Sequence, residues 1–175
     1  MLEKLLPNMR VNSVYDIDLE ELAARGVKGI ITDLDNTLVG AKEPLATPEL
    51  VKWLDKLKAA GFRVVILSNN NSLRVSSFAA PLQVPFLHKA RKPIAKSFRR
   101  ALNMLGLKPE ETVMIGDQML TDVLGGNRMG LYTILVTPIA PLDEGFTTLI
   151  NRRIERIALS RLRKRGLWYE EETHR

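Results

Sequence analysis

The chain has 175 residues, of which 45% are hydrophobic, so we expect one globular domain with a sizeable core rather than two domains. It has no cysteine, which excludes disulfides, thiolate zinc sites and a thiol nucleophile. The net charge of +6 suits nucleic acid, anionic lipid or phosphorylated partners without choosing among them. No apolar stretch approaches the roughly 18 residues of a membrane span, and the amino end lacks a signal peptide's apolar core, so we expect a cytoplasmic protein.

The apolar pattern along the chain predicts short buried strands that alternate with amphipathic helices. Residues 1–15 are apolar enough to pack against a neighbouring surface but too broken by Pro7 for a long helix, and we assign them no chemistry. Helices are expected at residues 18–24, 48–60, 72–80, 93–105 and 146–165. Strands are expected at residues 29–32, 63–67, 84–88, 112–115 and 132–136. This alternation predicts an α/β fold, a three-layer Rossmann-like sandwich with a five-stranded, mainly parallel sheet covered on both faces.

We expect three regions along the chain: an N-terminal arm with a short helix at residues 1–26, a core at 27–140, and a basic amphipathic helix with its tail at 141–175. On or near one side of that helix lie the apolar residues Ile150, Ile154, Ile157, Ala158 and Leu162. Two interpretations stay open. The isoleucines pack on the core with the arginines in solvent, or the helix adsorbs to anionic lipid, where each basic residue contributes roughly 1 kcal/mol.

Acidic, hydroxyl, amide and cationic residues follow four of the predicted strands. In chain order they are Asp33, Asp35 and Thr37, then Ser68 and Asn69, then Lys92, and then Asp117 and Asp122. Open α/β sheets build their sites at the edge where the carboxyl ends of parallel strands meet. Two carboxylates as close as Asp33 and Asp35 repel each other unless a cation or a shared proton relieves them, so they indicate a hard divalent metal such as Mg²⁺. Taken alone, the same segment also fits a solvated turn.

Together these segments resemble the four motifs of the haloacid dehalogenase (HAD) superfamily of phosphatases. The matching segments are Asp33-Leu34-Asp35-Asn36-Thr37, Ser68-Asn69, Lys92-Pro93 and Gly116-Asp117 followed by Asp122. The resemblance covers about residues 27 to 137, and four motifs in the same order are far more specific than any one of them. It implies a HAD-type phosphoric monoester hydrolase that uses Mg²⁺.

The resemblance also implies a role for each residue. Asp33 is the nucleophile that forms an aspartyl phosphate, and Asp35 is the general acid and base. The metal ligands are Asp33, Asp117 and the carbonyl of Asp35, while Asp122 lies at the metal or beside it and could orient Lys92. The phosphate is bound by Ser68, Asn69, Lys92 and Thr37.

Plainer alternatives exist for several of these residues. Lys89 or Arg91 could bind the phosphate in place of Lys92, because the three cations lie close together in the sequence. Ser68 and Asp122 could cap helices. Mn²⁺ could replace Mg²⁺, because both accept oxygen ligands.

The intervals from Thr37 to Ser68 and from Ser68 to Lys92 each have room for one helix and its strand, so no large cap domain is expected. A site without a lid excludes water poorly around a small substrate, which favours a bulky phosphorylated one. Over nearly its whole length the chain also resembles the capless YqeG-type phosphatases of HAD subfamily IIIA. That group is related to phosphatases of phosphatidylglycerophosphate, which implies this lipid as substrate and, with the basic helix, peripheral contact with the inner membrane face.

The alternative from a different functional class is a catalytically weak module that binds RNA or the ribosome through phosphate groups. The aromatic residues near the basic helix are only Trp168 and Tyr169, so base stacking has little support. The sequence predicts no particular oligomeric state.

Overall fold

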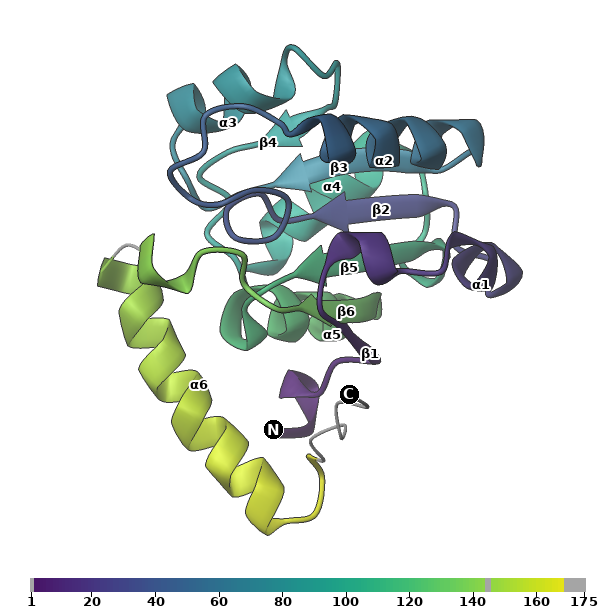
Figure 1. The fold of residues 1–175 in the computed structure, drawn as a ribbon. Helices are drawn as coiled ribbons and strands as arrows, with labels where there is room; N and C mark the ends of the chain where they lie inside the picture. The colour runs from purple at the N-terminus through teal and green to yellow at the C-terminus, as the bar shows by residue number, and fades with distance from the viewer. Residues whose placement is uncertain (1, 144–145, 169–175) are drawn as a thin grey trace.

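The structure, a computed structural model, describes residues 2–143 and 146–168. The described chain forms a sheet of six parallel strands in the order β1-β6-β5-β2-β3-β4 (Figure 1). The strands are β1 (Met9–Val11), β2 (Gly29–Thr32), β3 (Arg63–Leu67), β4 (Phe86–Leu87), β5 (Thr112–Gly116) and β6 (Tyr132–Val136). The predicted α/β sandwich with a parallel sheet is therefore confirmed. The part of the predicted 141–175 region that follows Trp168 lies outside the described residues.

The sheet has one strand more than the five predicted. β1 comes from the N-terminal residues, for which no strand was predicted, and it pairs with β6 so that Met9 lies opposite Ile134. The prediction was wrong here because a strand of three half-buried residues carries no periodic signal of its own. β1 forms because β6 offers it an edge to pair with. Its last residue, Val11, accepts a hydrogen bond of 3.2 Å from the amide of Thr137.

All the helices in the described chain except α5, for which no range was predicted, lie close to the predicted ranges. They are α1 (Leu19–Ala24), α2 (Pro48–Ala59), α3 (Ser72–Ala79), α4 (Ala95–Leu105), α5 (Leu124–Met129) and α6 (Phe146–Lys164). Asp18 and Thr47 cap the amino ends of α1 and α2 with side-chain oxygens. α4 begins two residues later than predicted, at Ala95. The intervals between β2 and β3 and between β3 and β4 each contain one helix, so the core is capless as expected.

Alternate residues of the central strands fill two separate cores. Ile30 of β2 packs with Leu57 of α2 and Phe78 of α3 on one face of the sheet. Its neighbour Ile31 packs with Phe98 of α4 on the other face. All of these side chains are at most 1% exposed, and fully burying each stabilises the fold by roughly 1.5–3 kcal/mol. A sheet buried on both faces explains why its strands are apolar at successive positions.

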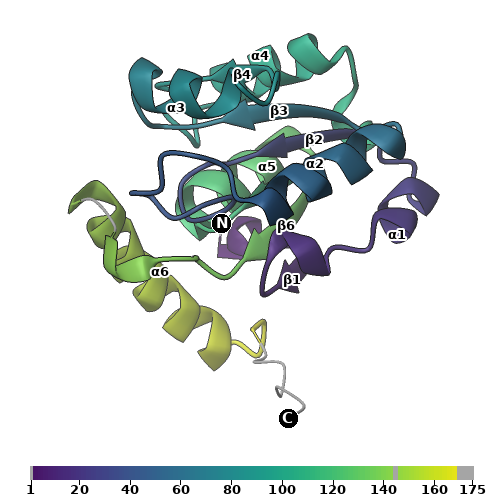
Figure 2. The ribbon, with the colours of Figure 1, turned by 45° about the horizontal axis from the view of Figure 1, so that its top comes forward.

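Helix α6 lies on the side of the sheet toward which the strands point, and it packs against the turn that follows β5 (Figures 1 and 2). Ala158 and Leu162 bury one side of α6 against Leu5 and Met119. Three isoleucines are instead 43, 47 and 56% exposed, and they are Ile150, Ile154 and Ile157. The interpretation in which these isoleucines pack on the core is therefore wrong, because other residues of α6 make that contact. Within the described residues, no helix is both long and apolar enough to cross a membrane.

Candidate active site

The centre of the site is Lys92, which follows β4. Its side chain is 2% exposed, and its Nζ lies 2.7 Å from Asp33 Oδ1 and 2.7 Å from Asp122 Oδ1. Burial would lower the pKa of the ammonium group, but the charges of Asp122 and Asp33 outweigh burial and raise it, so Lys92 stays charged. Lys89 and Arg91 are exposed. Of the three neighbouring cations, the structure thus places Lys92 among the acidic residues.

Three carboxylates form an acidic cluster around this lysine. One oxygen each from Asp33, Asp117 and Asp122 lies within 4.8 Å of the others, and all three residues are at most 5% exposed. Burial raises the pKa of Asp33, which Lys92 opposes and Asp122 reinforces. Burial and the charges of Asp33 and Asp122 raise the pKa of Asp117 well above its usual range. Both carboxylates are therefore harder to ionise here than in water, and a further positive charge beside them would stabilise their ionised forms.

The charge balance of the site fits a divalent cation. Among the described residues gathered here, five carboxylates face three cationic side chains, an excess of two negative charges. The carboxylates are Asp33, Asp35, Asp117, Asp122 and Glu155, and the cations are Arg74, Lys92 and Arg152. Hard divalent cations such as Mg²⁺ prefer oxygen ligands, and a 2+ charge would balance this excess. The predicted metal ligands Asp33 and Asp117 are among the three clustered residues.

Gly116 makes room for Asp122 in this cluster. A Cβ atom at Gly116 would lie 2.3 Å from the Asp122 carboxylate, far inside any real contact. Asp122 belongs to a π-helical turn, η4 (Met119–Val123), and its Oδ2 accepts a hydrogen bond of 3.1 Å from the amide of Gln118. A residue without a side chain at the end of β5 therefore lets Asp122 approach Lys92.

Asp35 points to a different set of partners. Its Oδ1 accepts a hydrogen bond of 3.0 Å from Arg74 Nε, and its Oδ2 accepts one of 3.0 Å from Asn70 Nδ2. Arg74 is itself held by the carbonyl of Glu43 at 2.6 Å. The sequence analysis did not identify Asn70 or Arg74. Asn70 directly follows the predicted Ser68-Asn69 segment, whereas no local pattern distinguishes Arg74.

The remaining predicted residues hold the site together. Thr37 donates a hydrogen bond of 3.2 Å to Asp117 Oδ1. Ser68 is buried, and its hydroxyl accepts a hydrogen bond of 3.1 Å from the amide of Asn70. Asn69 binds the backbone of Lys92, because its Oδ1 accepts a hydrogen bond of 2.7 Å from the Lys92 amide. These contacts join the four predicted segments in two pairs, the first segment with the fourth and the second with the third.

Two further residues come from α6 and were not singled out by the sequence analysis. Arg152 donates a hydrogen bond of 2.6 Å to the carbonyl of Asp117 and forms an ion pair with its carboxylate. Glu155 is buried and pairs with Arg152 at 3.2 Å. A run of basic residues in the sequence gives no signal that one of them, Arg152, turns toward the site.

A known protein of similar sequence matches nearly the whole chain. The chain is 53% identical to a protein named probable phosphatase YqeG, from Bacillus subtilis (strain 168), over 95% of this chain and 96% of that protein. This chain belongs to the YqeG-type phosphatases of the HAD superfamily. A family model described as "HAD-hyrolase-like" matches residues 89–138.

Other relatives of this YqeG-type phosphatase are more distant. Phosphatidylglycerophosphate phosphatase 1, chloroplastic/mitochondrial, of Arabidopsis thaliana is 30% identical over 93% of this chain, which spans 49% of that protein's length. The solved structure of the cobalt-bound deoxy-D-mannose-octulosonate 8-phosphate phosphatase of Haemophilus influenzae aligns with a TM-score of 0.51 at 17% identity, over 78% of this chain and 89% of that one. The structural likeness shows that the fold is shared.

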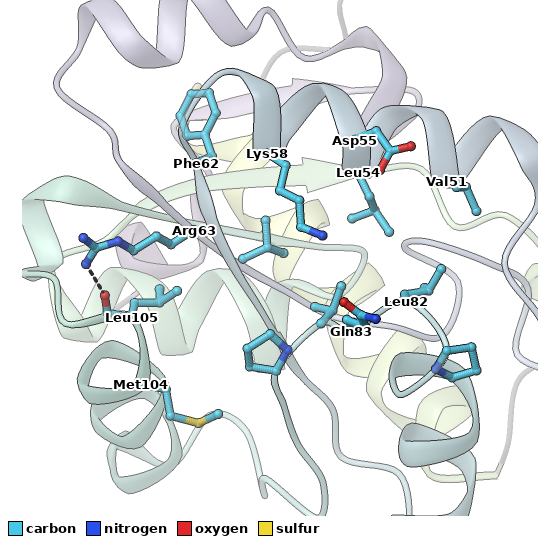
Figure 3. Close-up of a pocket in the computed structure, with 14 residues that line it drawn as sticks. Val51, Leu54, Asp55, Lys58, Phe62, Arg63, Leu82, Gln83, Met104 and Leu105 are labelled. Carbon is cyan, nitrogen blue, oxygen red and sulfur yellow. Dashed lines mark hydrogen bonds between the residues drawn. The ribbon is translucent and has the colours of Figure 1, made fainter.

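A separate hollow of about 540 Å³ lies away from the acidic cluster of this YqeG-type phosphatase (Figure 3). Arg63, the first residue of β3, lines it, whereas Ser68 follows the last residue of that strand. Its walls are mainly apolar, with Leu54 of α2 and Leu82 and Met104 from other segments. None of the residues from the four HAD motifs lines this hollow, so the acidic cluster remains the candidate active site.

Proposed function

We propose that the chain is a Mg²⁺-dependent phosphomonoester hydrolase that acts through an aspartyl phosphate, with phosphatidylglycerophosphate as its substrate. The observation that carries the chemistry is the buried contact of Lys92 with both Asp33 and Asp122, next to Asp117. Phosphoryl transfer needs a nucleophile held in line and positive charge around the phosphoryl oxygens, and this group of residues can supply both.

In this proposal the carboxylates of Asp33 and Asp117 and the carbonyl of Asp35 would hold Mg²⁺. When bound, the metal would neutralise charge on the phosphoryl oxygens and align the phosphate with the nucleophile. Asp122 holds Lys92, and Thr37 holds Asp117 through the hydrogen bond to Oδ1. Direct contact of Thr37 with the phosphate stays a prediction.

The reaction has two displacements at phosphorus. In the first, a carboxylate oxygen of Asp33 forms a bond to phosphorus, the bond to the leaving oxygen breaks, and the carboxylic acid of Asp35 gives that oxygen a proton. In the second, Asp35 takes a proton from a water whose oxygen bonds to phosphorus. The Asp33–phosphorus bond then breaks and inorganic phosphate leaves.

Other residues would hold the transferred group. Lys92 places a fixed positive charge beside Asp33 and would stabilise the phosphoryl oxygens, with hydrogen bonds from the Ser68 hydroxyl and the amide of Asn69. For the acid step, Asp35 must exchange its present contacts with Arg74 and Asn70 for the leaving oxygen. Arg74 and Asn70 therefore set the position of the Asp35 carboxylate before the reaction.

The lipid substrate is supported by the exposed side of α6. Ile150, Ile154 and Ile157 recur at helical spacing, and exposed arginines such as Arg153 and Arg156 lie between them. An amphipathic helix with this composition binds anionic lipid surfaces through apolar burial and charge together. The 30% identical Arabidopsis relative is named for phosphatidylglycerophosphate, and a capless site can admit a bulky lipid headgroup.

The test is phosphate release from phosphatidylglycerophosphate in mixed micelles, compared with a soluble phosphomonoester, with and without Mg²⁺. We expect release that requires Mg²⁺, far exceeds release from the soluble ester, and disappears in Asp33→Asn. Release from the soluble ester alone would retain the phosphatase and reject the lipid. An Asp33→Asn variant with full activity would reject Asp33 as the nucleophile, and no release from either substrate would favour the phosphate-binding module.

Membrane contact needs its own measurement. We expect the chain to sediment with vesicles that contain anionic phosphatidylglycerol, and the bound fraction to fall as salt rises. Ile154→Glu should reduce binding without affecting hydrolysis of a soluble ester. Equal binding to neutral vesicles at all salt concentrations would contradict the role of the basic helix.

A further inference from the structure

The contacts of α6 cover the segment between Asp117 and Asp122. Arg152 binds the carbonyl and the carboxylate of Asp117. Asn151 donates a hydrogen bond of 3.2 Å to the side chain of Gln118. Glu155 accepts a hydrogen bond of 3.0 Å from the amide of Leu120. One turn of α6 thus contacts the segment from Asp117 to Asp122 at several points, and this segment carries two of the clustered carboxylates.

These contacts are partly buried, whereas the neighbouring basic side chains of the helix face solvent. The side chains of Arg152 and Asp117 are 19% and 0% exposed, and that of Glu155 is 6% exposed. Arg153 and Arg156, on the same helix, are exposed. Burial of a paired arginine requires that its hydrogen bonds be satisfied, and Glu155 supplies an acceptor beside Asp117. The rotation of α6 is therefore defined by polar contacts as well as by Ala158 and Leu162.

We propose that Arg152 is a positioning residue for Asp117, so that α6 is a working part of the metal site. The inference rests on the proposed role of Asp117 as a Mg²⁺ ligand. A guanidinium group presents several N–H donors in one plane, so Arg152 can hold the backbone and the carboxylate of Asp117 at once. Asp117 is then fixed before the metal arrives.

Replacement of Arg152 by lysine separates geometry from charge. Lysine keeps the positive charge but is a flexible point donor, which cannot reproduce both contacts. Residues that orient a metal ligand typically change metal affinity by about 10–100-fold when mutated. We expect Arg152→Lys to weaken Mg²⁺ binding by about tenfold, and Arg153→Lys, the matched exposed control, to leave it unchanged.

The experiment measures Mg²⁺ binding to the full chain by calorimetry, together with hydrolysis of a soluble phosphomonoester as Mg²⁺ is varied. We expect Arg152→Lys to require about ten times more Mg²⁺ for half-maximal activity, with little change in the substrate KM at saturating Mg²⁺. Circular dichroism and Tm without metal establish that the variant is folded. If Arg152→Lys is unfolded, the conservative variant Glu155→Gln, which keeps the acceptor for Leu120, should show a weaker effect of the same kind.

Other outcomes overturn the inference. Unchanged Mg²⁺ binding in Arg152→Lys and in Glu155→Gln would mean that α6 does not position the ligand. A raised substrate KM with unchanged Mg²⁺ binding would instead make Arg152 a substrate-binding residue. Asp117→Asn tests the underlying assignment separately, because a variant that still binds Mg²⁺ normally would reject Asp117 as a ligand. If Asp117→Asn loses Mg²⁺ binding but Arg152→Lys binds Mg²⁺ normally, the positioning role of Arg152 is rejected while Asp117 remains a ligand.

Discussion

Replacement of Gly116 by alanine should disrupt both the stability and the chemistry of the site. The added methyl group would lie 2.3 Å from the Asp122 carboxylate, so that group must move by roughly 1 Å to restore an ordinary contact of about 3.5 Å. Asp122 has no open space to enter, because it is 1% exposed. The movement must lengthen its ion pair with Lys92, which is now 2.7 Å.

The expected cost follows from two effects. Lengthening the ion pair by 1 Å costs about 1.5–2 kcal/mol at an effective dielectric constant of about 20. Overpacking in a close-packed interior adds about 1–3 kcal/mol. We therefore expect Gly116→Ala to lower the free energy of unfolding by about 3–4 kcal/mol, which is a fall in Tm of roughly 10 °C for a chain of this size. Activity should fall as well, because Lys92 loses the partner that orients it.

Gly40→Ala is the control. The nearest heavy atoms to a Cβ at Gly40 are 3.4 Å away, so that methyl group should fit at little cost. Urea unfolding followed by circular dichroism, without metal, compares both variants with the original chain. If Gly116→Ala unfolds within about 0.5 kcal/mol of Gly40→Ala, the argument that Gly116 exists to admit Asp122 is refuted.

Three more predictions concern charges in the site. Lys92→Met should lower kcat by about 10²–10³-fold in a steady-state assay. Arg91→Met, at an exposed position, should retain activity. Similar losses in both variants would contradict the choice of Lys92. Burial raises the pKa of Asp117 above its unfolded value of about 3.9, so the metal-free fold loses stability as the pH rises from about 4 through the raised pKa. Asparagine cannot ionise, so in EDTA the Tm of Asp117→Asn should rise relative to that of the original chain as the pH rises. A constant difference in Tm across that range would refute this. Arg74→Ala should release Asp35 and slow hydrolysis of an alkyl phosphate by about tenfold or more. Hydrolysis of p-nitrophenyl phosphate should slow less, because its leaving group needs no proton. Equal losses with both substrates would argue against Asp35 as the acid.

Much of the architecture could be predicted because local patterns determine it. The strands at Gly29–Thr32 and Thr112–Gly116 are apolar at successive positions, as a sheet covered on both faces requires. Helix α2 begins at Pro48 after the cap Thr47, as predicted. Parallel strands place their carboxyl ends at one edge, so the polar residues that follow them could be expected to meet.

Other features depended on contacts between distant segments. β1 has three residues and exists because the edge of β6 can pair with it. Helix α6 looked like a single apolar stripe in the sequence, but the contacts of Ala158 and Leu162 leave Ile154 exposed and turn Arg152 toward Asp117. A local pattern shows which residues share a helix face but does not identify the neighbour that the face meets.

The same division holds at the site. The sequence by itself determined the residue types and their order: a pair of carboxylates, a hydroxyl, a lysine and two further carboxylates, each after a strand. Only the tertiary structure decided which cation lies among them, because Lys92 is buried between Asp33 and Asp122 while Lys89 and Arg91 face solvent. The physical reason is that spacing along the chain sets which side chains can reach one edge of a sheet, whereas burial and charge pairing arise only when all the elements have packed.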